Sequence, residues 1–321
     1  MEINQYSLIL ILVGGTLFLY LLRKYFKGGQ FTERVSAKGK IALVTGANTG
    51  LGLETARGLN LKGAKVYMLC RSEVRANEAR IALAQKGCDA TRLIYVNCDF
   101  AKFASVRACA DRIAKLESHI DILVNNAGVF YPNWKLTEDG HEMTFQCNHL
   151  GPFLLTELLL PLLEKSDEGR VVNVSSLAHE SSDPLNLETI DTEAGYGSNF
   201  ASYCRSKLVN VMHARELTRR LRADGCTTVT VNSLHPGVVR TELARHYGWF
   251  NLVYTNVLAF FMKTAKDGAQ TSLFLALSKT VKGVSGCYYA DCARRAESAV
   301  ALDDLACKQL YDYSLKAAGL A

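Results

Sequence analysis

The chain has 321 residues, of which 49% are hydrophobic and 21% are charged, a composition that supplies a sizeable core and argues against global disorder. Its net charge is only +6, and no dense basic run with interleaved aromatic residues suggests a nucleic-acid partner. The ten cysteines form no C-x-x-C pair, which argues against a metal site and fits unpaired thiols in a reducing compartment.

The first feature along the chain is an uncharged run over residues 6–22. A helix of this length reaches about 25 Å, slightly less than a ~30 Å hydrocarbon core, and mild bilayer thinning would cover the difference. A basic run over 23–27 follows, and basic residues prefer the cytoplasmic side of a membrane. No small-residue cleavage site follows, which favours an uncleaved anchor over a secretory signal peptide. The sequence predicts a membrane anchor with its basic flank over 1–27, a linker over 28–39 and a cytosol-facing domain over 40–321.

From Lys40 onward, short apolar runs alternate with helical stretches. Strands are predicted over 41–44, 65–70, 93–97, 122–125, 170–175 and 229–234, and helices up to Leu61 and over 72–86, 104–116, 140–165 and 203–221. Strands that are apolar on both faces and alternate with helices are typical of a parallel sheet covered on both sides. The predicted fold is therefore a single α/β domain of the Rossmann type, with a doubly wound, mostly parallel sheet.

Three glycines, Gly46, Gly50 and Gly52, lie between the first strand and the first helix of this domain. Glycines let the backbone approach phosphates, and a helix N-terminus supplies N–H donors and the positive end of a dipole. A lone glycine cluster is usually just a turn. Its position after the first strand of a βαβ series predicts a dinucleotide pyrophosphate site.

Tyr203 and Lys207 stand four residues apart at the start of a predicted helix. Four residues is about one turn, so the phenol and the ammonium would leave the same face. A free Tyr titrates near ~10, and a neighbouring cation that favours the phenolate would make Tyr203 a usable general acid or base. The same spacing occurs on many solvated helix faces, so the pair alone leaves both interpretations open.

Five motifs in a fixed order resemble the short-chain dehydrogenase/reductase family, over roughly residues 38–290. They are Thr45-Gly46-x-x-x-Gly50-x-Gly52, Asn125-Asn126-Ala127-Gly128, Asn173-Val174-Ser175-Ser176, Tyr203-x-x-x-Lys207 and Pro236-Gly237-Val238-Val239-Arg240-Thr241. Within that family the chain is most similar to the membrane-anchored retinol dehydrogenases, through the stretches 45–50, 148–156, 174–179 and 233–237 and through the N-terminal anchor.

The resemblance implies a role for each motif. Tyr203 would be the proton donor or acceptor, and Lys207 would lower its pKa and bind the nicotinamide ribose. Ser176, which aligns with the catalytic position where Ser175 does not, would hydrogen-bond the substrate oxygen, and Asn148 would hold a proton-relay water. Asp99 would contact the adenine and Asn126 would border the nicotinamide. The expected cofactor-binding set is Gly46, Asn48, Thr49, Gly50, Leu51, Gly52, Arg71, Asp99, Asn126, Tyr203, Lys207, Pro236, Gly237 and Thr241.

The end of the second strand distinguishes the two nicotinamide cofactors. About twenty residues after the glycine turn, an acidic residue binds the ribose hydroxyls of NAD, whereas an Arg accepts the 2′-phosphate of NADP. The sequence there is Leu69-Cys70-Arg71-Ser72, with no acid at the strand end. Arg71 therefore predicts NADP(H), the alternative being a solvent-facing Arg that opens the next helix.

The uncharged run over residues 248–262 bears on the substrate. By resemblance, the segment after the sixth strand closes over the substrate, so the run suggests a lipophilic one; a core helix or a bilayer contact are the alternatives. The expected function is hydride transfer between NADP(H) and an apolar alcohol or aldehyde, either a retinoid or a lipid. A steroid or lipid carbonyl reductase is the alternative, followed by a non-catalytic nucleotide-sensing scaffold. Family likeness implies the endoplasmic reticulum membrane first and the mitochondrion second, and the oligomeric state stays open.

Overall fold

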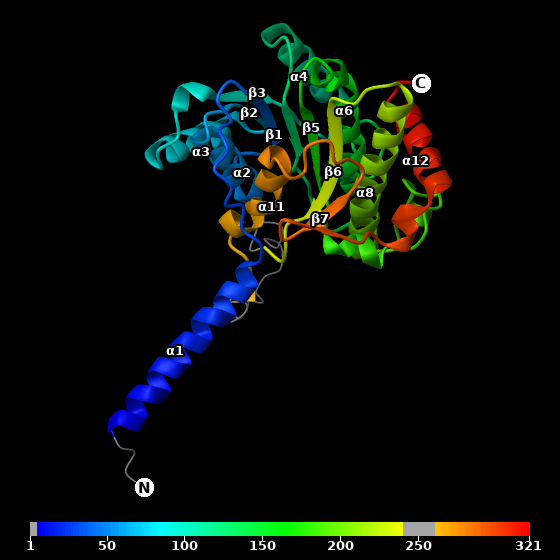
Figure 1. Cartoon of the computed structure of the whole chain (residues 1–321). Helices are drawn as coiled ribbons and strands as arrows, with labels where there is room; N and C mark the ends of the chain where they lie inside the picture. Colours follow the sequence, from blue (N-terminus) through cyan, green and yellow to red (C-terminus); the bar gives the residue numbers. More distant parts are fainter. Residues whose placement is uncertain (1–4, 240–260) are drawn as a thin grey trace.

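The described strands form one eight-stranded sheet in the order β3-β2-β1-β4-β5-β6-β7-β8 (Figure 1). The computed structural model describes residues 5–239 and 261–321, with side chains from Val13 onward. All strand pairs from β3 to β7 are parallel, and β8 runs antiparallel to β7. The predicted mostly parallel sheet is confirmed. Its strands are β1 (Ile41–Thr45), β2 (Lys65–Cys70), β3 (Leu93–Asn97), β4 (Ile122–Asn125), β5 (Gly169–Val174), β6 (Val229–His235), β7 (Tyr288–Ala290) and β8 (Ala293–Arg295).

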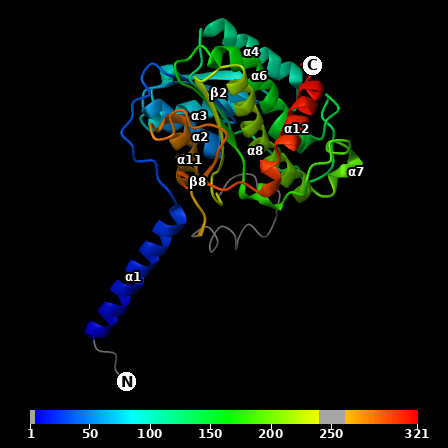
Figure 2. The same cartoon turned by 45° about the vertical axis from the view of Figure 1, so that its right-hand side comes forward.

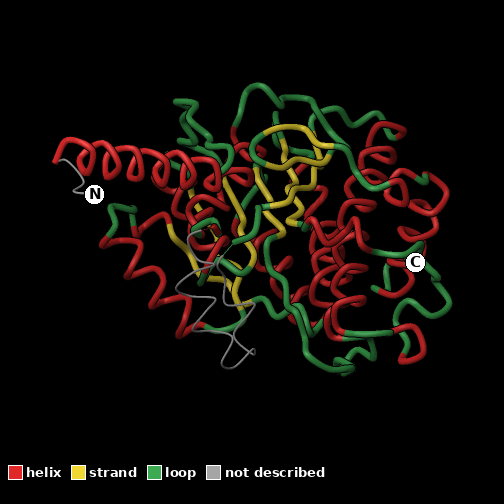
Figure 3. Tube along the Cα trace, turned by 90° about the horizontal axis from the view of Figure 1, so that it is seen from below, coloured by secondary structure: helices red, strands yellow, loops and turns green. Residues whose placement is uncertain are grey.

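Helices cover both faces of this sheet (Figures 1, 2 and 3). One face is covered by α2 (Gly50–Leu61), α3 (Glu73–Gln85) and α11 (Ala265–Leu277). The other is covered by α4 (Phe103–Leu116), α6 (Gly151–Leu163) and α8 (Asn199–Ala223), and α12 (Asp304–Ala317) packs against α8 from outside. Shorter helical turns are η1 (Ala90–Arg92), η3 (Leu177–Ser181), α7 (Glu193–Tyr196) and η6 (Ala299–Leu302).

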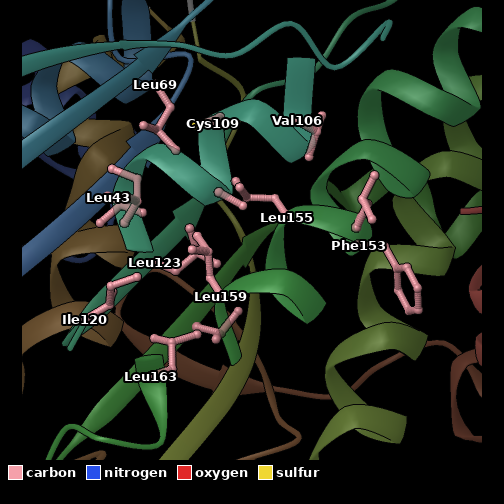
Figure 4. Close-up of a cluster of buried hydrophobic side chains, with 14 of the residues drawn as sticks. Leu43, Leu69, Val106, Cys109, Ile120, Leu123, Phe153, Leu155, Leu159 and Leu163 are labelled. Atoms are coloured by element: carbon pink, nitrogen blue, oxygen red, sulfur yellow. The ribbon is translucent and has the colours of Figure 1, made fainter. Parts of the chain in front are cut away.

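The two faces of the sheet carry separate cores because strand side chains alternate. In β1, Leu43 belongs to the core beneath α4, α6 and α8, whereas Ala42 and Val44 belong to the core beneath α2, α3 and α11. Figure 4 shows the first of these cores, where Leu43 gathers with Leu155 and other side chains. Burial on both faces explains why the strands read as continuous apolar runs.

The helix predicted over 140–165 is interrupted. It begins at α5 (Met143–Phe145), passes through a π-helical turn, η2 (Gln146–Leu150), and continues as α6. Its start is fixed by Glu142, whose carboxylate accepts from the backbone N–H groups of Thr144 and Phe145. The π turn holds Asn148, a predicted site residue.

The N-terminal helix α1 (Gln5–Lys27) extends away from the sheet domain in both side views (Figures 1 and 2). Most of its described apolar side chains are exposed, with Phe18 for example 64% exposed, whereas Leu22 and Phe26 near its end are half-buried. The predicted helix is therefore present. None of the helices within residues 5–239 and 261–321 is long and apolar enough to cross a membrane. Of the uncharged run 248–262, only Phe261 and Met262 are among the described residues.

Candidate active site

The predicted site residues gather at the carboxyl edge of the sheet, where β1, β4, β5 and β6 end. Strand β1 pairs with β2 on one side and with β4 on the other, so the chain order reverses between β1 and β4. In open α/β sheets, ligands bind in the crevice beyond the strand ends at such a switch point. The topology thus brings the glycine turn and the Tyr203 helix to one edge.

The glycine turn follows β1 directly and leads into α2. Gly46 and Gly50 have φ values of +64° and +55°, a region that favours glycine. A methyl group at Gly52 would overlap the Gly46 carbonyl oxygen and lie 2.5 Å from Asn126 Nδ2. The N-cap residue Thr49 makes no side-chain capping bond. The amides of the first turn of α2 and its positive dipole end are thus suited to an anionic group.

Thr45 joins the ends of β1 and β4. Its Oγ1 accepts from the backbone N–H groups of Asn126 (2.9 Å) and Ala127 (2.8 Å), and Asn126 Nδ2 donates to the Thr45 carbonyl (2.8 Å). Asn126 and Ala127 are therefore held against the end of β1 by three hydrogen bonds, two of them from Asn126. Sequence reasoning named Asn126 but assigned no role to Thr45, although Thr45 opens the glycine motif.

The two serines after β5 have different surroundings. Ser175 is buried, and its Oγ donates to the Lys207 carbonyl at 2.6 Å. The Ser176 hydroxyl faces the Tyr203 phenol and acts to lower its pKa, and its Oγ accepts from the Ala178 N–H at 3.2 Å. Because successive side chains in extended backbone point to opposite sides, Ser175 bonds the backbone of α8, whereas Ser176 faces the Tyr203 phenol.

Tyr203 lies in the second turn of α8, because that helix begins at Asn199 and not at the tyrosine. Ser198 is the N-cap, and its side chain accepts from the Ala201 N–H. Burial raises the pKa of Tyr203 above its ordinary value, although the hydrogen bond with Ser176 acts in the opposite direction. The phenol is therefore protonated at neutral pH.

Lys207 is almost fully buried one turn below the phenol. Its Nζ donates to the Val174 carbonyl at 3.1 Å and lies 5.6 Å from the centre of the Tyr203 ring. Burial lowers the pKa of Lys207 to about 8. Desolvation is the dominant influence on the Tyr203 pKa in this structure, and the effect of Lys207 on that pKa stays a prediction.

Asn148 is fixed by its side-chain amide within the π turn. Its Oδ1 accepts from the Val129 N–H at 2.7 Å, and its Nδ2 donates to the Val129 carbonyl (2.9 Å) and to Ser206 Oγ (3.0 Å). A methyl group at Gly128 would lie 3.3 Å from Asn148 Oδ1 and 3.4 Å from Lys207 Nζ. The glycine therefore lets Asn148 and Lys207 approach the end of β4 together.

Phe130 is a site residue that sequence reasoning missed. Its ring packs edge-on against Tyr203, with centroids 5.2 Å apart and planes at 76°. It follows the Asn125–Gly128 motif by two residues, and this position was the available signal. Leu177, beside Ser176, is 39% exposed, so the surroundings of the phenol include apolar surface.

Arg71 and Asp99 follow the ends of β2 and β3. Arg71 is exposed, and its backbone carbonyl accepts from Asn97 Nδ2 at 3.0 Å. Asp99 Oδ1 accepts from the Ala101 N–H at 3.1 Å. Both residues lie at the same edge of the sheet as the glycine turn.

The turn after β6 carries Pro236 and Gly237. Gly237 has φ +90°, and a methyl group there would lie 2.5 Å from Lys263 Cδ. Thr241, the last predicted cofactor contact, lies outside the described residues.

The sequence of the whole domain identifies the family. The short chain dehydrogenase family profile matches residues 40–248. The chain belongs to the short-chain dehydrogenase family. It is 45% identical over 292 residues to retinol dehydrogenase 14 of Mus musculus, covering 86% of this chain and 85% of that protein. It is 40% identical over 309 residues to human retinol dehydrogenase 12, covering 94% of this chain and 95% of that protein. The resemblance stated from the motifs is confirmed.

Solved structures agree with the fold of this short-chain dehydrogenase. An uncharacterised protein from Mycobacterium paratuberculosis is 31% identical, with a TM-score of 0.73 and coverage of 91% of this chain and 98% of that one. A short chain dehydrogenase from Escherichia coli CFT073 complexed with NADPH has a TM-score of 0.63 at 23% identity. The match covers 81% of this chain and 99% of that one. The second comparison bears on the fold alone.

Most residues predicted for the dehydrogenase site thus lie at one sheet edge, whereas their catalytic and binding roles stay proposals. The structure places the Ser176 hydroxyl at the Tyr203 phenol, and it places Asn148 and Lys207 together beside Gly128. Lys207 holds the Val174 carbonyl at the end of β5. The arrangement joins a protonated phenol, a hydroxyl and a buried amine at the switch point of the sheet.

Proposed function

We propose that this short-chain dehydrogenase is an NADP(H)-dependent oxidoreductase that moves hydride between nicotinamide and an apolar alcohol or aldehyde, specifically retinol or retinal. The observation that carries the proposal is the placement of the Ser176 hydroxyl and the Lys207 ammonium beside the Tyr203 phenol, with Lys207 Nζ 5.6 Å from the centre of the phenol ring. This arrangement suits proton transfer to or from a carbonyl oxygen.

The glycine turn fits a dinucleotide. No side chain stands at Gly46 or Gly52, where even a methyl group would crowd Ala127 or Asn126, so backbone N–H groups can approach a pyrophosphate. The nicotinamide, when bound, supplies the hydride or accepts it. Arg71 at the end of β2, with no acid beside it, supports NADP(H), since a guanidinium can bind the 2′-phosphate by charge-assisted hydrogen bonds. Asp99 and Asn126 would contact the adenine and border the nicotinamide.

Each polar side chain near the phenol has a distinct task in the proposed reaction. During reduction, Tyr203 donates its proton to the carbonyl oxygen of the substrate, and Ser176 holds the same oxygen by a hydrogen bond. The ammonium of Lys207 stabilises the phenolate that remains. Asn148, whose amide is fixed by Val129 and Ser206, would hold the water that returns a proton. Oxidation of an alcohol uses the same groups in reverse.

An apolar substrate is supported by the surroundings of the phenol and by the relatives. Phe130 packs on the Tyr203 ring, and Leu177 is exposed beside Ser176. The two relatives named above are called retinol dehydrogenases. A retinoid aldehyde is therefore the first substrate to test.

Membrane attachment through α1 is part of the proposal. The helix exposes Leu17, Phe18 and other apolar side chains, and it ends with Lys24 and Lys27 in its last turn. An apolar helix with a basic end suits a lipid surface whose cytoplasmic leaflet is anionic. The endoplasmic reticulum, with the domain facing the cytosol, is the proposed site, and the mitochondrion is second.

The test is a substrate screen of the purified full chain with NADPH and NADH. All-trans-retinal should turn over with NADPH, and Tyr203→Phe, which keeps the ring and removes the proton, should lower kcat by at least about hundredfold. Robust turnover of ketosteroids without retinal turnover would replace the retinoid assignment by the steroid one. Tighter binding of NADH than of NADPH would refute the role of Arg71. If the Tyr203→Phe variant kept the full biological effect, catalysis would not be the function, and the non-catalytic scaffold would be the remaining hypothesis.

A further inference from the structure

Four segments that are distant in the sequence meet at one ion pair beside the Pro236–Gly237 turn. The Lys263 ammonium, on a side chain that is 7% exposed, pairs with the Asp291 carboxylate. Asp291 and Cys292 form the turn between β7 and β8, and both have positive φ, at 54° and 58°. Few residues other than glycine adopt this conformation, so the surrounding contacts determine the position of the hairpin tip. Lys263 N–H also donates to the Val238 carbonyl at 2.9 Å.

On one side, the Lys263 side chain packs against the turn after β6. A methyl group at Gly237 would lie 2.5 Å from Lys263 Cδ and 2.6 Å from Cε. Because no side chain at Gly237 separates them, the stem of the lysine supports the backbone of the turn directly. Movement of Lys263 must therefore move Gly237 or leave a gap beneath it.

On the other side, the same ion pair contacts the linker that follows α1. Gly29 N–H donates to Asp291 Oδ1 at 3.3 Å, and a methyl group at Gly29 would overlap the Asp291 carbonyl oxygen. A methyl group at Gly28 would lie 2.7 Å from Lys263 Nζ. Both linker glycines are therefore in direct contact with the ion pair.

The base of α1 makes two further contacts with the residues just before Lys263. Arg23 donates to the Met262 carbonyl at 2.9 Å. The rings of Phe26 and Phe261 meet edge to face with centroids 5.2 Å apart. The end of α1 and residues 261–263 therefore form one contact region.

We propose that Lys263 and Asp291 are positioning residues that couple the base of α1 to the Pro236–Gly237 turn. This inference rests on the proposed function and on the prediction that Pro236 and Gly237 contact the cofactor. A rigid path then runs from the linker through Asp291 and the stem of Lys263 to the turn. Burial acts to raise the pKa of Asp291, but Lys263 holds it below its ordinary value, so the Asp291 carboxylate stays ionised at neutral pH.

The test compares two glycine substitutions in the full chain. Gly29→Ala breaks the contact with Asp291. Gly15→Ala in α1 is the matched control, because a methyl group at Gly15 meets nothing within 4 Å and its φ is not positive. Hydrogen exchange at the Lys263 amide, NADPH affinity by fluorescence titration, and kcat with an apolar aldehyde are measured for both.

We expect Gly29→Ala to accelerate exchange at Lys263 and to lower kcat about tenfold, because small displacements of a reacting group are costly. NADPH affinity should stay within about twofold, since the glycine turn holds the pyrophosphate. The control should change none of the three. Asp291→Asn, which keeps the shape and removes the charge, should lower kcat similarly, and the loss in the double variant should be less than the product of the two.

Unchanged exchange at Lys263 in Gly29→Ala would overturn the coupling. Faster exchange with wild-type kcat would overturn the positioning role. If wild-type protein turned over no aldehyde, the proposed function would fail, and the exchange comparison would still decide whether linker and turn are coupled.

Discussion

Lys207 offers a test of the site that combines stability with catalysis. The residue is 5% exposed, and burial lowers its pKa from 10.5 to about 8. In the unfolded chain the ammonium is hydrated, and the pKa returns to its ordinary value. Lys207→Met keeps an unbranched side chain and removes the titrating group, so the comparison of the two proteins isolates the buried charge.

The sign of the effect follows from proton binding. Between about pH 8 and pH 10.5, Lys207 binds fewer protons in the folded chain than in the unfolded chain, so its contribution to stability rises with pH. Each pH unit between two pKa values corresponds to about 1.4 kcal/mol. From pH 7 to pH 10 the wild-type free energy of unfolding should therefore gain about 2–3 kcal/mol relative to Lys207→Met. The lost bond to the Val174 carbonyl affects both pH values equally and cancels.

Urea unfolding at the two pH values, followed by circular dichroism, measures this difference. Lys266→Met on α11 is the matched control, because Lys266 is exposed. Turnover of Lys207→Met should fall at least about hundredfold while the fold persists. The difference in unfolding free energy between wild type and Lys207→Met should change with pH. If it does not, or if Lys266→Met shows the same change, burial does not lower the pKa of Lys207.

Three further substitutions test the cofactor and substrate sides of the site. Arg71→Glu should lower the NADPH-over-NADH preference by roughly tenfold to hundredfold, because charged hydrogen bonds contribute about 1.5–3 kcal/mol. Steady-state kinetics with both nucleotides measure this preference, and Arg80→Glu on α3 is the charge-matched control. Gly52→Ala should weaken NADPH binding in fluorescence titrations and cost about 1–3 kcal/mol of stability. Gly58→Ala in the same helix crowds the Leu273 side chain instead of the glycine turn, so it should cost stability and leave NADPH binding unchanged. Phe130→Ala should lower kcat/KM up to about tenfold, since an edge-to-face pair contributes about 0.5–1.5 kcal/mol; unchanged kinetics would show that the ring does not orient Tyr203.

Features set by local sequence could be predicted closely. The strand predicted over 122–125 has the same bounds as β4, and the glycine turn leads into α2 at Gly50. The spacing of Tyr203 and Lys207 predicted a shared helix face, because the period of a helix is a local property. The start of their helix was misplaced because its N-cap, Ser198, lies upstream of the motif.

Features that depend on contacts between distant segments could not be predicted. Apolar and polar residues alternate from Met143 to Leu163 in a pattern that an ordinary helix also accommodates, so the sequence does not distinguish the π turn from continued helix. That turn presents Asn148 to Val129, nineteen residues away, and the pairing exists only in the fold. Likewise the Lys263–Asp291 pair depends on the hairpin of β7 and β8, elements that were not predicted.

Burial shifts the pKa values of the two titrating groups of the site in opposite directions, and in each group it favours the neutral form. It keeps the Tyr203 phenol protonated, the form that donates a proton to a carbonyl oxygen. It also brings the pKa of Lys207 to about 8, so at neutral pH most of the amine still carries the charge that stabilises a phenolate. In the proposed reaction, oxidation of an alcohol needs the phenolate at the outset, and burial disfavours that form. Rates of both directions measured against pH should therefore show alcohol oxidation rising above neutral pH, and an oxidation rate that is independent of pH would contradict the role assigned to Tyr203.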